Sequence, residues 1–193
     1  MKQLEKYCLV SRKKFYIISI IVIAIAEPIF TGILMVGDED SDGIENPVIA
    51  AVIAAAFILI SWLFIHHGMI TKPRKRFKGR LKYFERNGLL NYAISDVQCG
   101  VTKFDGKVLL GKYCIMGKGS GLIVFYNEIS SMYVKIDRNT DDEGCTTETW
   151  NLKIDAGGKT YQICSVKKDQ QSIREWAEIC NFIQLKAPNI YLK

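Results

Sequence analysis

One carboxyl group, Glu27, lies within a long apolar stretch of the chain and is followed directly by Pro28. Burying a charged group at that depth of a membrane costs about 2.5 kcal/mol or more, so Glu27 has either a function or a local hydrogen-bond partner. The functional interpretation is a proton or cation site, or a polar contact with a partner. The structural interpretation is a helix kink at Pro28, which frees backbone carbonyls that a protonated Glu27 helps to satisfy. We favour the structural interpretation.

A second group of carboxylates, Asp38, Asp40 and Asp42, lies in a segment that matches the first six positions of a calcium-binding EF-hand loop. The match ends there, because the position that should supply a bidentate glutamate is Ile49. A solvated acidic turn is the preferred interpretation, with weak calcium binding as the alternative. His66 and His67 are adjacent, and neighbouring residues of a helix point about 100° apart, so we expect no metal site there.

The segments that resemble catalytic motifs lack the partners that catalysis needs. Gly117-Lys118 is followed by Gly119 rather than by Ser or Thr, so a β-turn explains these residues better than a phosphate-binding loop. The six cysteines form no Cys-x-x-Cys pair, and residues 81–193 contain no histidine, which argues against Cys-His and Ser-His mechanisms and against ordinary zinc sites. We therefore expect a protein that is not an enzyme and that needs no cofactor.

Two apolar stretches predict transmembrane helices over residues 15–36 and 47–70, because about 20 apolar residues in a helix cross the hydrocarbon of a bilayer. Both exceed the apolar core of a cleaved signal peptide. Lys and Arg flank the pair on both outer ends, whereas the loop 37–46 has neither and carries five acidic residues. The positive-inside rule then places this loop outside and both termini in the cytoplasm of a cell-membrane protein.

The formal net charge of +6 is concentrated beside the membrane, because residues 83–193 hold 14 basic and 13 acidic side chains. This distribution favours contact with an anionic inner leaflet, which attracts basic residues by about 1 kcal/mol each, over binding to nucleic acid. The juxtamembrane residues expected to contact lipid headgroups are Lys72, Arg74, Lys75, Arg76, Lys78 and Arg80.

The remaining sequence predicts a basic helical linker over residues 71–98 and a cytoplasmic domain over 99–193, with residues 1–14 as a basic cytoplasmic N-terminus. Alternating apolar residues and Asp-Gly or Gly-Gly turns predict an antiparallel meander, and helical spacing predicts a final amphipathic helix over 172–185. The expected fold class is a membrane α-helical hairpin plus an α+β domain. The expected strands are 101–104, 107–116, 121–126, 132–137, 147–155 and 159–166.

Part of this domain resembles the bacterial pleckstrin-homology (PH) pattern. The resemblance rests on a strand with Leu109, the glycine turn 117–119, the strand 122–126, the segment Asn127-Glu128-Ile129 and, in the last helix, Arg174-Glu175-Trp176. The whole layout is similar to uncharacterised bacterial membrane proteins with two spans and a PH-like cytoplasmic domain. The resemblance implies an antiparallel meander or partly closed barrel with a C-terminal helix, a binding role, and headgroup contacts from Lys103 and Lys107.

Together these features predict a membrane-anchored interaction or scaffold protein, whose partners are the anionic inner leaflet and either another protein or a second copy of the chain. The alternative is a small transporter, channel or sensor subunit that uses Glu27. Replacement of Glu27 by glutamine distinguishes the two, since only the alternative needs the ionisable group.

Overall fold

The computed structural model describes residues 1–38, 41–42, 46–140 and 144–192. It forms two compact units: Val10–Lys72, and Met1–Leu9 together with Pro73–Lys193. The structure is α+β, because helices accompany two four-stranded sheets, neither of which is closed. The aspartates of the expected calcium-like loop fall largely outside this description: Asp40 is not among the described residues, and for Asp38 and Asp42 only the backbone is described.

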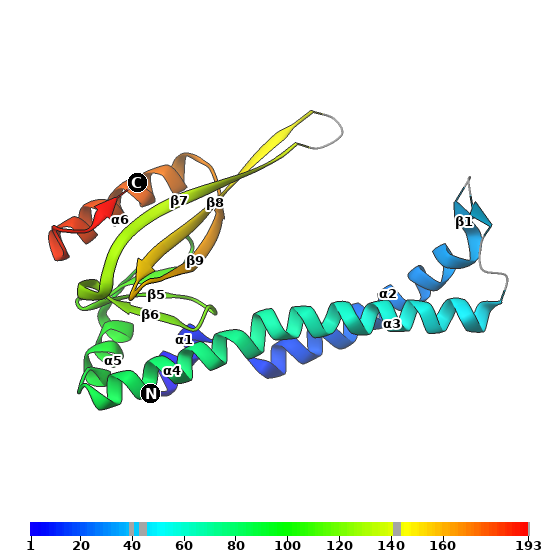
Figure 1. Cartoon of the computed structure of the whole chain (residues 1–193), viewed down its shortest axis with the longest axis horizontal. Coiled ribbons are helices and arrows are strands. Elements are labelled where there is room, and N and C mark those ends of the chain that lie inside the picture. The colour runs from blue at the N-terminus through cyan, green and yellow to red at the C-terminus, as the bar shows by residue number, and fades with distance from the viewer. Residues whose placement is uncertain (39–40, 43–45, 141–143, 193) are drawn as a thin grey trace. The chain divides into compact units, whose positions relative to one another are not determined.

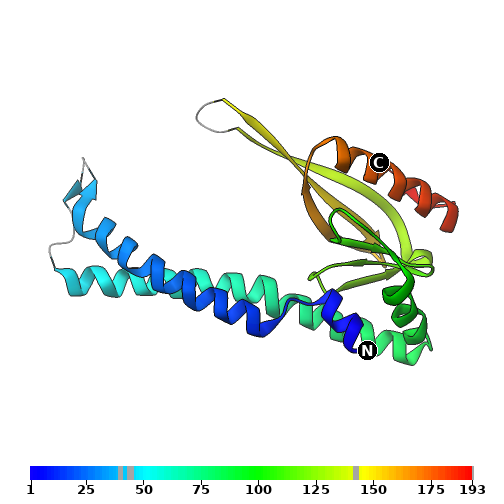
Figure 2. The same cartoon turned by 180° about the vertical axis from the view of Figure 1, so that it is seen from behind.

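The unit Val10–Lys72 is a pair of long helices, α2 (Arg12–Val36) and α3 (Pro47–His66), which lie side by side in Figures 1 and 2. Short strands β1 (Gly37–Asp38) and β2 (Ser41–Asp42) pair antiparallel between them. The start of α3 is fixed by Asn46, whose side chain accepts the Val48 N–H at 2.9 Å. Both helices are long and apolar enough to cross a membrane.

The two helices approach each other through small residues. Ala50 and Ala54, four positions apart on α3, are fully buried, whereas most large apolar side chains of both helices are exposed. Small side chains at these positions allow two helices to lie close together, whereas the neighbouring Ala55 and Ala56 are exposed. The helix continues through a π-helical turn, His67–Thr71, into α4 (Lys72–Arg86).

The larger unit contains the helices α1 (Lys2–Cys8), α4 and α5 (Leu90–Cys99), followed by two sheets. The first sheet has the order β3-β4-β5-β6 and is antiparallel throughout. The second has the order β10-β7-β8-β9, with β10 parallel to β7. The strands are β3 (Val101–Lys103), β4 (Val108–Leu110), β5 (Cys114–Gly117), β6 (Leu122–Phe125), β7 (Ile129–Thr140), β8 (Thr146–Ala156), β9 (Lys159–Lys167) and β10 (Tyr191–Leu192). A short 3-10 helix, Tyr126–Glu128, joins β6 to β7.

The helix α6 (Gln170–Lys186) covers the second sheet, as both views show. Its buried residues Ile179 and Ile183 join a core that includes Met132, Leu152 and Ile154, while Trp176 packs against the same core. The alternation of apolar and polar residues in β8 places Leu152 and Ile154 in the core, whereas Asn151, which points to the other face, is also buried. Two residues of the predicted apolar stripe, Ile173 and Ala177, are instead exposed.

The first sheet is buried on both faces, because a second core of side chains from α1, α4 and α5 covers its other side. Strands β4, β5 and β6 are therefore apolar at nearly every position and not only at alternate ones. The sequence did not reveal that the N-terminus takes part. Leu4 and Cys8 are fully buried, and Tyr7 donates its hydroxyl to the Gly106 carbonyl at 3.0 Å.

The prediction of a single strand over residues 107–116 is wrong. The chain forms two strands there, β4 and β5, which are joined by a tight turn. The carboxylate of Asp96 holds this turn. It accepts the N–H groups of Lys112 at 2.9 Å and of Tyr113 and Cys114 at 2.8 Å. A run of apolar residues therefore reverses direction around a buried polar group that comes from a preceding helix.

Candidate functional site

The basic helix α4 separates its lysines from most of its arginines. Lys75, Lys78 and Lys82 are exposed, and so is Lys72 at the first residue of the helix. The arginines Arg74, Arg76 and Arg80 are half-buried, on the side that carries the buried Pro73, Phe77 and Phe84. At about 100° per residue, Arg76 and Arg80 fall on the opposite side of the helix from Lys75, Lys78 and Lys82, and Arg74 lies between the two sides. We call Lys75, Lys78 and Lys82 the lysine face.

Arg80 is a structural residue of the domain. Its Nε donates to the Ile123 carbonyl at 2.8 Å, and its guanidinium pairs with Glu128. The same guanidinium lies 4.8 Å from the centre of the Phe84 ring. Glu128 also accepts the Phe125 N–H at 3.0 Å, so this pair joins α4 to the end of β6. The contacts of Arg80 therefore explain why arginine occupies this position, because a planar guanidinium group carries several N–H donors that point in different directions.

Other basic residues expected at lipid headgroups also make contacts within the domain. Arg76 donates to the Ser120 carbonyl at 3.3 Å, and Arg74 lies 3.5 Å from the Glu5 carboxylate. Lys103 pairs with Glu178, and Lys107 donates to the Ser165 carbonyl at 2.9 Å. Headgroup contact for the full set stays a prediction; the exposed members of the set are Lys72, Lys75, Lys78 and Lys107.

The long strand β7 has an open edge. On one side it pairs with β8 from Ile129 to Thr140, whereas on the other side β10 pairs only with Ser131 and Met132. Among the described residues, no strand occupies the outer edge of residues 133–140. The side chains of residues 135–140 are exposed, and Figure 1 shows the β7–β8 ribbon extending past the other strands of its sheet. The sequence missed this edge because it predicted a strand half as long.

The thiols of this unit are poor nucleophiles. Burial raises the pKa of Cys8 and of Cys164 to about 12, and burial, followed by the nearby Asp96 carboxylate, raises the pKa of Cys114 well above its ordinary value. A raised pKa leaves almost no thiolate near neutral pH. These three cysteines pack as small apolar residues. Cys99, in contrast, is an exposed free thiol.

Within α2, Glu27 is half-buried and accepts a hydrogen bond from the Thr31 hydroxyl at 3.4 Å. The helix runs through Pro28 without interruption. This local partner supports a structural role for the carboxyl group, although its function stays untested. The described part of the chain contains no group of three or more His, Cys, Asp or Glu side chains placed to hold a metal ion.

His66 belongs to an aromatic cluster at one end of the hairpin. Its ring stacks on Trp62 with 5.1 Å between ring centres, and its Nε2 lies 3.2 Å from the Tyr16 hydroxyl. Tyr and Trp at such a position are typical of the interface between lipid and water. The cluster supports the interpretation of His66 as an interfacial residue.

Comparison with known proteins adds no relative to these observations. No protein-family model, curated protein or solved structure matches the chain. The function has to be argued from the geometry of the two units alone.

Proposed function

We propose that this chain is a non-enzymatic interaction protein of the cell membrane, in which the hairpin α2–α3 is an anchor and the α+β domain binds a protein partner. Both termini lie in the cytoplasm. The observation that carries the proposal is the open edge of β7 over residues 133–140.

The anchor is supported by the length of α2 and α3 and by their exposed surfaces. A 25-residue helix such as α2 is about 38 Å long at ~1.5 Å per residue, enough to cross a hydrocarbon layer about 30 Å thick. Exposure of its apolar side chains to water would be unfavourable, whereas their contact with lipid chains is favourable. These side chains include Ile18, Ile20, Ile21, Ile25 and Ile33.

The open edge of β7 supports binding of an extended peptide segment. An unpaired edge offers a row of backbone N–H and C=O groups, and a partner strand can add to it. The pairing of β10 in parallel with Ser131 and Met132 on the same edge supports this proposal. The unpaired part of the edge carries charged side chains, namely Lys135, Asp137 and Arg138. These charges discourage unspecific strand pairing with other chains and favour a partner of complementary charge.

A PH-like fold is part of the proposal. The antiparallel strands β3–β6 and β7–β9, followed by a helix whose Trp176 packs on the core, agree with the resemblance, although the sheets are open. The lysine face of α4 supports a position of the domain near anionic headgroups, because its three side chains are exposed.

The proposal is tested by photo-crosslinking in the native membrane. A benzoylphenylalanine residue is placed at Asn139, on the exposed part of β7, and at Gln184, an exposed position of α6, as the matched control. We expect an adduct of one defined protein from Asn139 and none from Gln184. No adduct from Asn139, or the same adducts from both positions, would contradict the proposed edge.

A further inference from the structure

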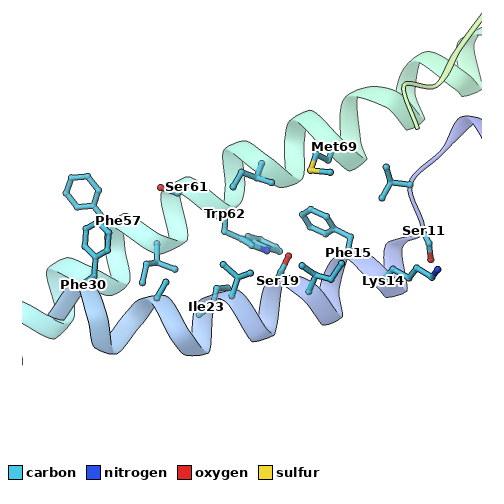
Figure 3. A pocket seen from close by; sticks show the side chains of 16 residues that line it. Ser11, Lys14, Phe15, Ser19, Ile23, Phe30, Phe57, Ser61, Trp62 and Met69 are labelled. Atoms are coloured by element: carbon cyan, nitrogen blue, oxygen red, sulfur yellow. The ribbon is translucent and has the colours of Figure 1, made fainter. Parts of the chain in front are cut away.

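The helices α2 and α3 enclose a groove with a volume of about 580 Å³. Ligand pockets commonly have about 300–1,000 Å³, so the groove is large enough for a small molecule or a lipid chain. Its wall is almost entirely apolar and includes Phe15, Ile18 and Ile23 of α2 and Ile58 and Ile65 of α3. Figure 3 shows these helices converging around the space between them.

The groove has two different ends. At one end lie the rings of Phe30 and Phe57, which stack with 6.5 Å between their centres. At the other end lie Lys14 and Ser11, which Figure 3 shows well away from the phenylalanine pair. Lys14 is the one charged residue in the lining. The 16 positions from Lys14 to Phe30 correspond to about 24 Å along α2 at ~1.5 Å per residue.

A polar group without a partner lies between these ends. The indole N–H of Trp62 is buried in the wall of the groove and has no acceptor among the described residues. A buried donor without an acceptor costs free energy, and tryptophan N–H groups at a membrane interface usually find a partner. The described lining of the groove therefore has a cation at one end and a pair of aromatic rings at the other, with mostly apolar side chains between them.

We propose that this groove binds one acyl chain of an anionic glycerophospholipid. The order of chemical groups matches: the phosphate lies beside Lys14, and the acyl chain runs between the helices toward Phe30 and Phe57. An anionic headgroup is favoured because Lys14, the charged residue of the described lining, places a cation at that end of the groove.

The test uses the purified full-length chain in micelles that contain equal amounts of dioleoyl phosphatidylglycerol and dioleoyl phosphatidylcholine, with native mass spectrometry as readout. We expect one phosphatidylglycerol to be retained in preference to phosphatidylcholine. Lys14→Gln should lower this preference about 5-fold, the effect of one basic residue near an anionic surface. Lys13→Gln, the matched control, removes the same charge outside the groove lining and should leave the preference nearly unchanged.

A second pair of variants tests the channel itself. Ser19 lines the groove beside Trp62 in Figure 3, so Ser19→Phe should fill the space and abolish retention of both lipids, whereas Ser19→Ala should retain them. Equal loss from Lys13→Gln and Lys14→Gln would overturn the headgroup site. Unchanged lipid retention by Ser19→Phe, or a mass that shows a second copy of the chain in place of lipid, would overturn the acyl-chain site.

Discussion

The carboxylate of Asp96 in α5 accepts hydrogen bonds from both the backbone N–H and the thiol of Cys114 in β5, at 2.8 Å and 3.3 Å. It also accepts the N–H groups of Lys112 and Tyr113, so one side chain satisfies three successive donors of the turn between β4 and β5. Asp96 is only 2% exposed. It connects the helical layer to the first sheet.

Asp96→Ala should destabilise the domain, because it leaves three N–H groups of the turn without their acceptor. A buried unsatisfied group costs about 1–3 kcal/mol, and since two of the three donors are only partly buried we expect a total loss of about 3 kcal/mol. The free energy of unfolding, measured by denaturant titration of the full chain in detergent, checks this. Glu85→Ala changes an exposed carboxylate and should have almost no effect. Equal stability of the two variants would contradict the role of Asp96.

Gly111→Ala should be nearly as damaging as loss of Asp96. A Cβ atom at Gly111 would lie 2.2 Å from Cγ of Asp96, so the carboxylate would have to move away from the turn. Gly79→Ala is the matched control, because nothing lies within 4 Å of its Cβ and alanine favours the helix by up to about 1 kcal/mol. Thermal unfolding should show a large decrease for Gly111→Ala and a small increase for Gly79→Ala. A larger decrease in unfolding temperature for Gly79→Ala than for Gly111→Ala would contradict this, because it would show that the turn can adjust to the added methyl group.

This turn also shows what sequence reasoning could and could not predict. The long apolar helices, the hairpin β8–β9 and the final helix were predictable, because local periodicity and glycine turns determine them. The break at Gly111 was not, since it depends on Asp96 in another element. For the same reason the structural roles of Arg76 and Arg80 could not be predicted. The sequence shows that these residues are basic, but the carbonyls of Ser120 and Ile123 that accept their hydrogen bonds become neighbours only in the folded chain.

The domain should lose stability at alkaline pH. The thiols of Cys8 and Cys164 have a pKa of about 12 in the folded chain, raised by burial from an ordinary value of 9.0. Between these values the unfolded chain releases protons that the folded chain keeps, so the free energy of unfolding falls as pH rises from 9 toward 12. Unfolding measured from pH 8 to 10.5 should show this decline, and Cys8→Ala should make it less steep. An unchanged slope in this variant would contradict the burial of the Cys8 thiol.

Arg80 and Lys78 should respond differently to the same substitution. Arg80→Gln removes the partner of Glu128 and the bond to the Ile123 carbonyl, and should cost about 2 kcal/mol, less than the ~3–5 of a fully buried pair. Lys78→Gln alters the exposed lysine face and should change the free energy of unfolding by less than about 0.5 kcal/mol. Denaturant titration distinguishes them. Similar losses from both would contradict the division of α4 into two faces.

The proposed topology is tested most directly by labelling cysteines with a maleimide that does not cross membranes. The exposed Cys99 lies in the domain, and Ser41→Cys adds a thiol in the loop between α2 and α3. In intact cells we predict labelling of Ser41→Cys and none of the unchanged chain, whose exposed Cys99 and Cys145 react only after the membrane is permeabilised. Labelling of Cys99 in intact cells, or labelling of Ser41→Cys only after permeabilisation, would contradict a hairpin that anchors the domain at the cytoplasmic face.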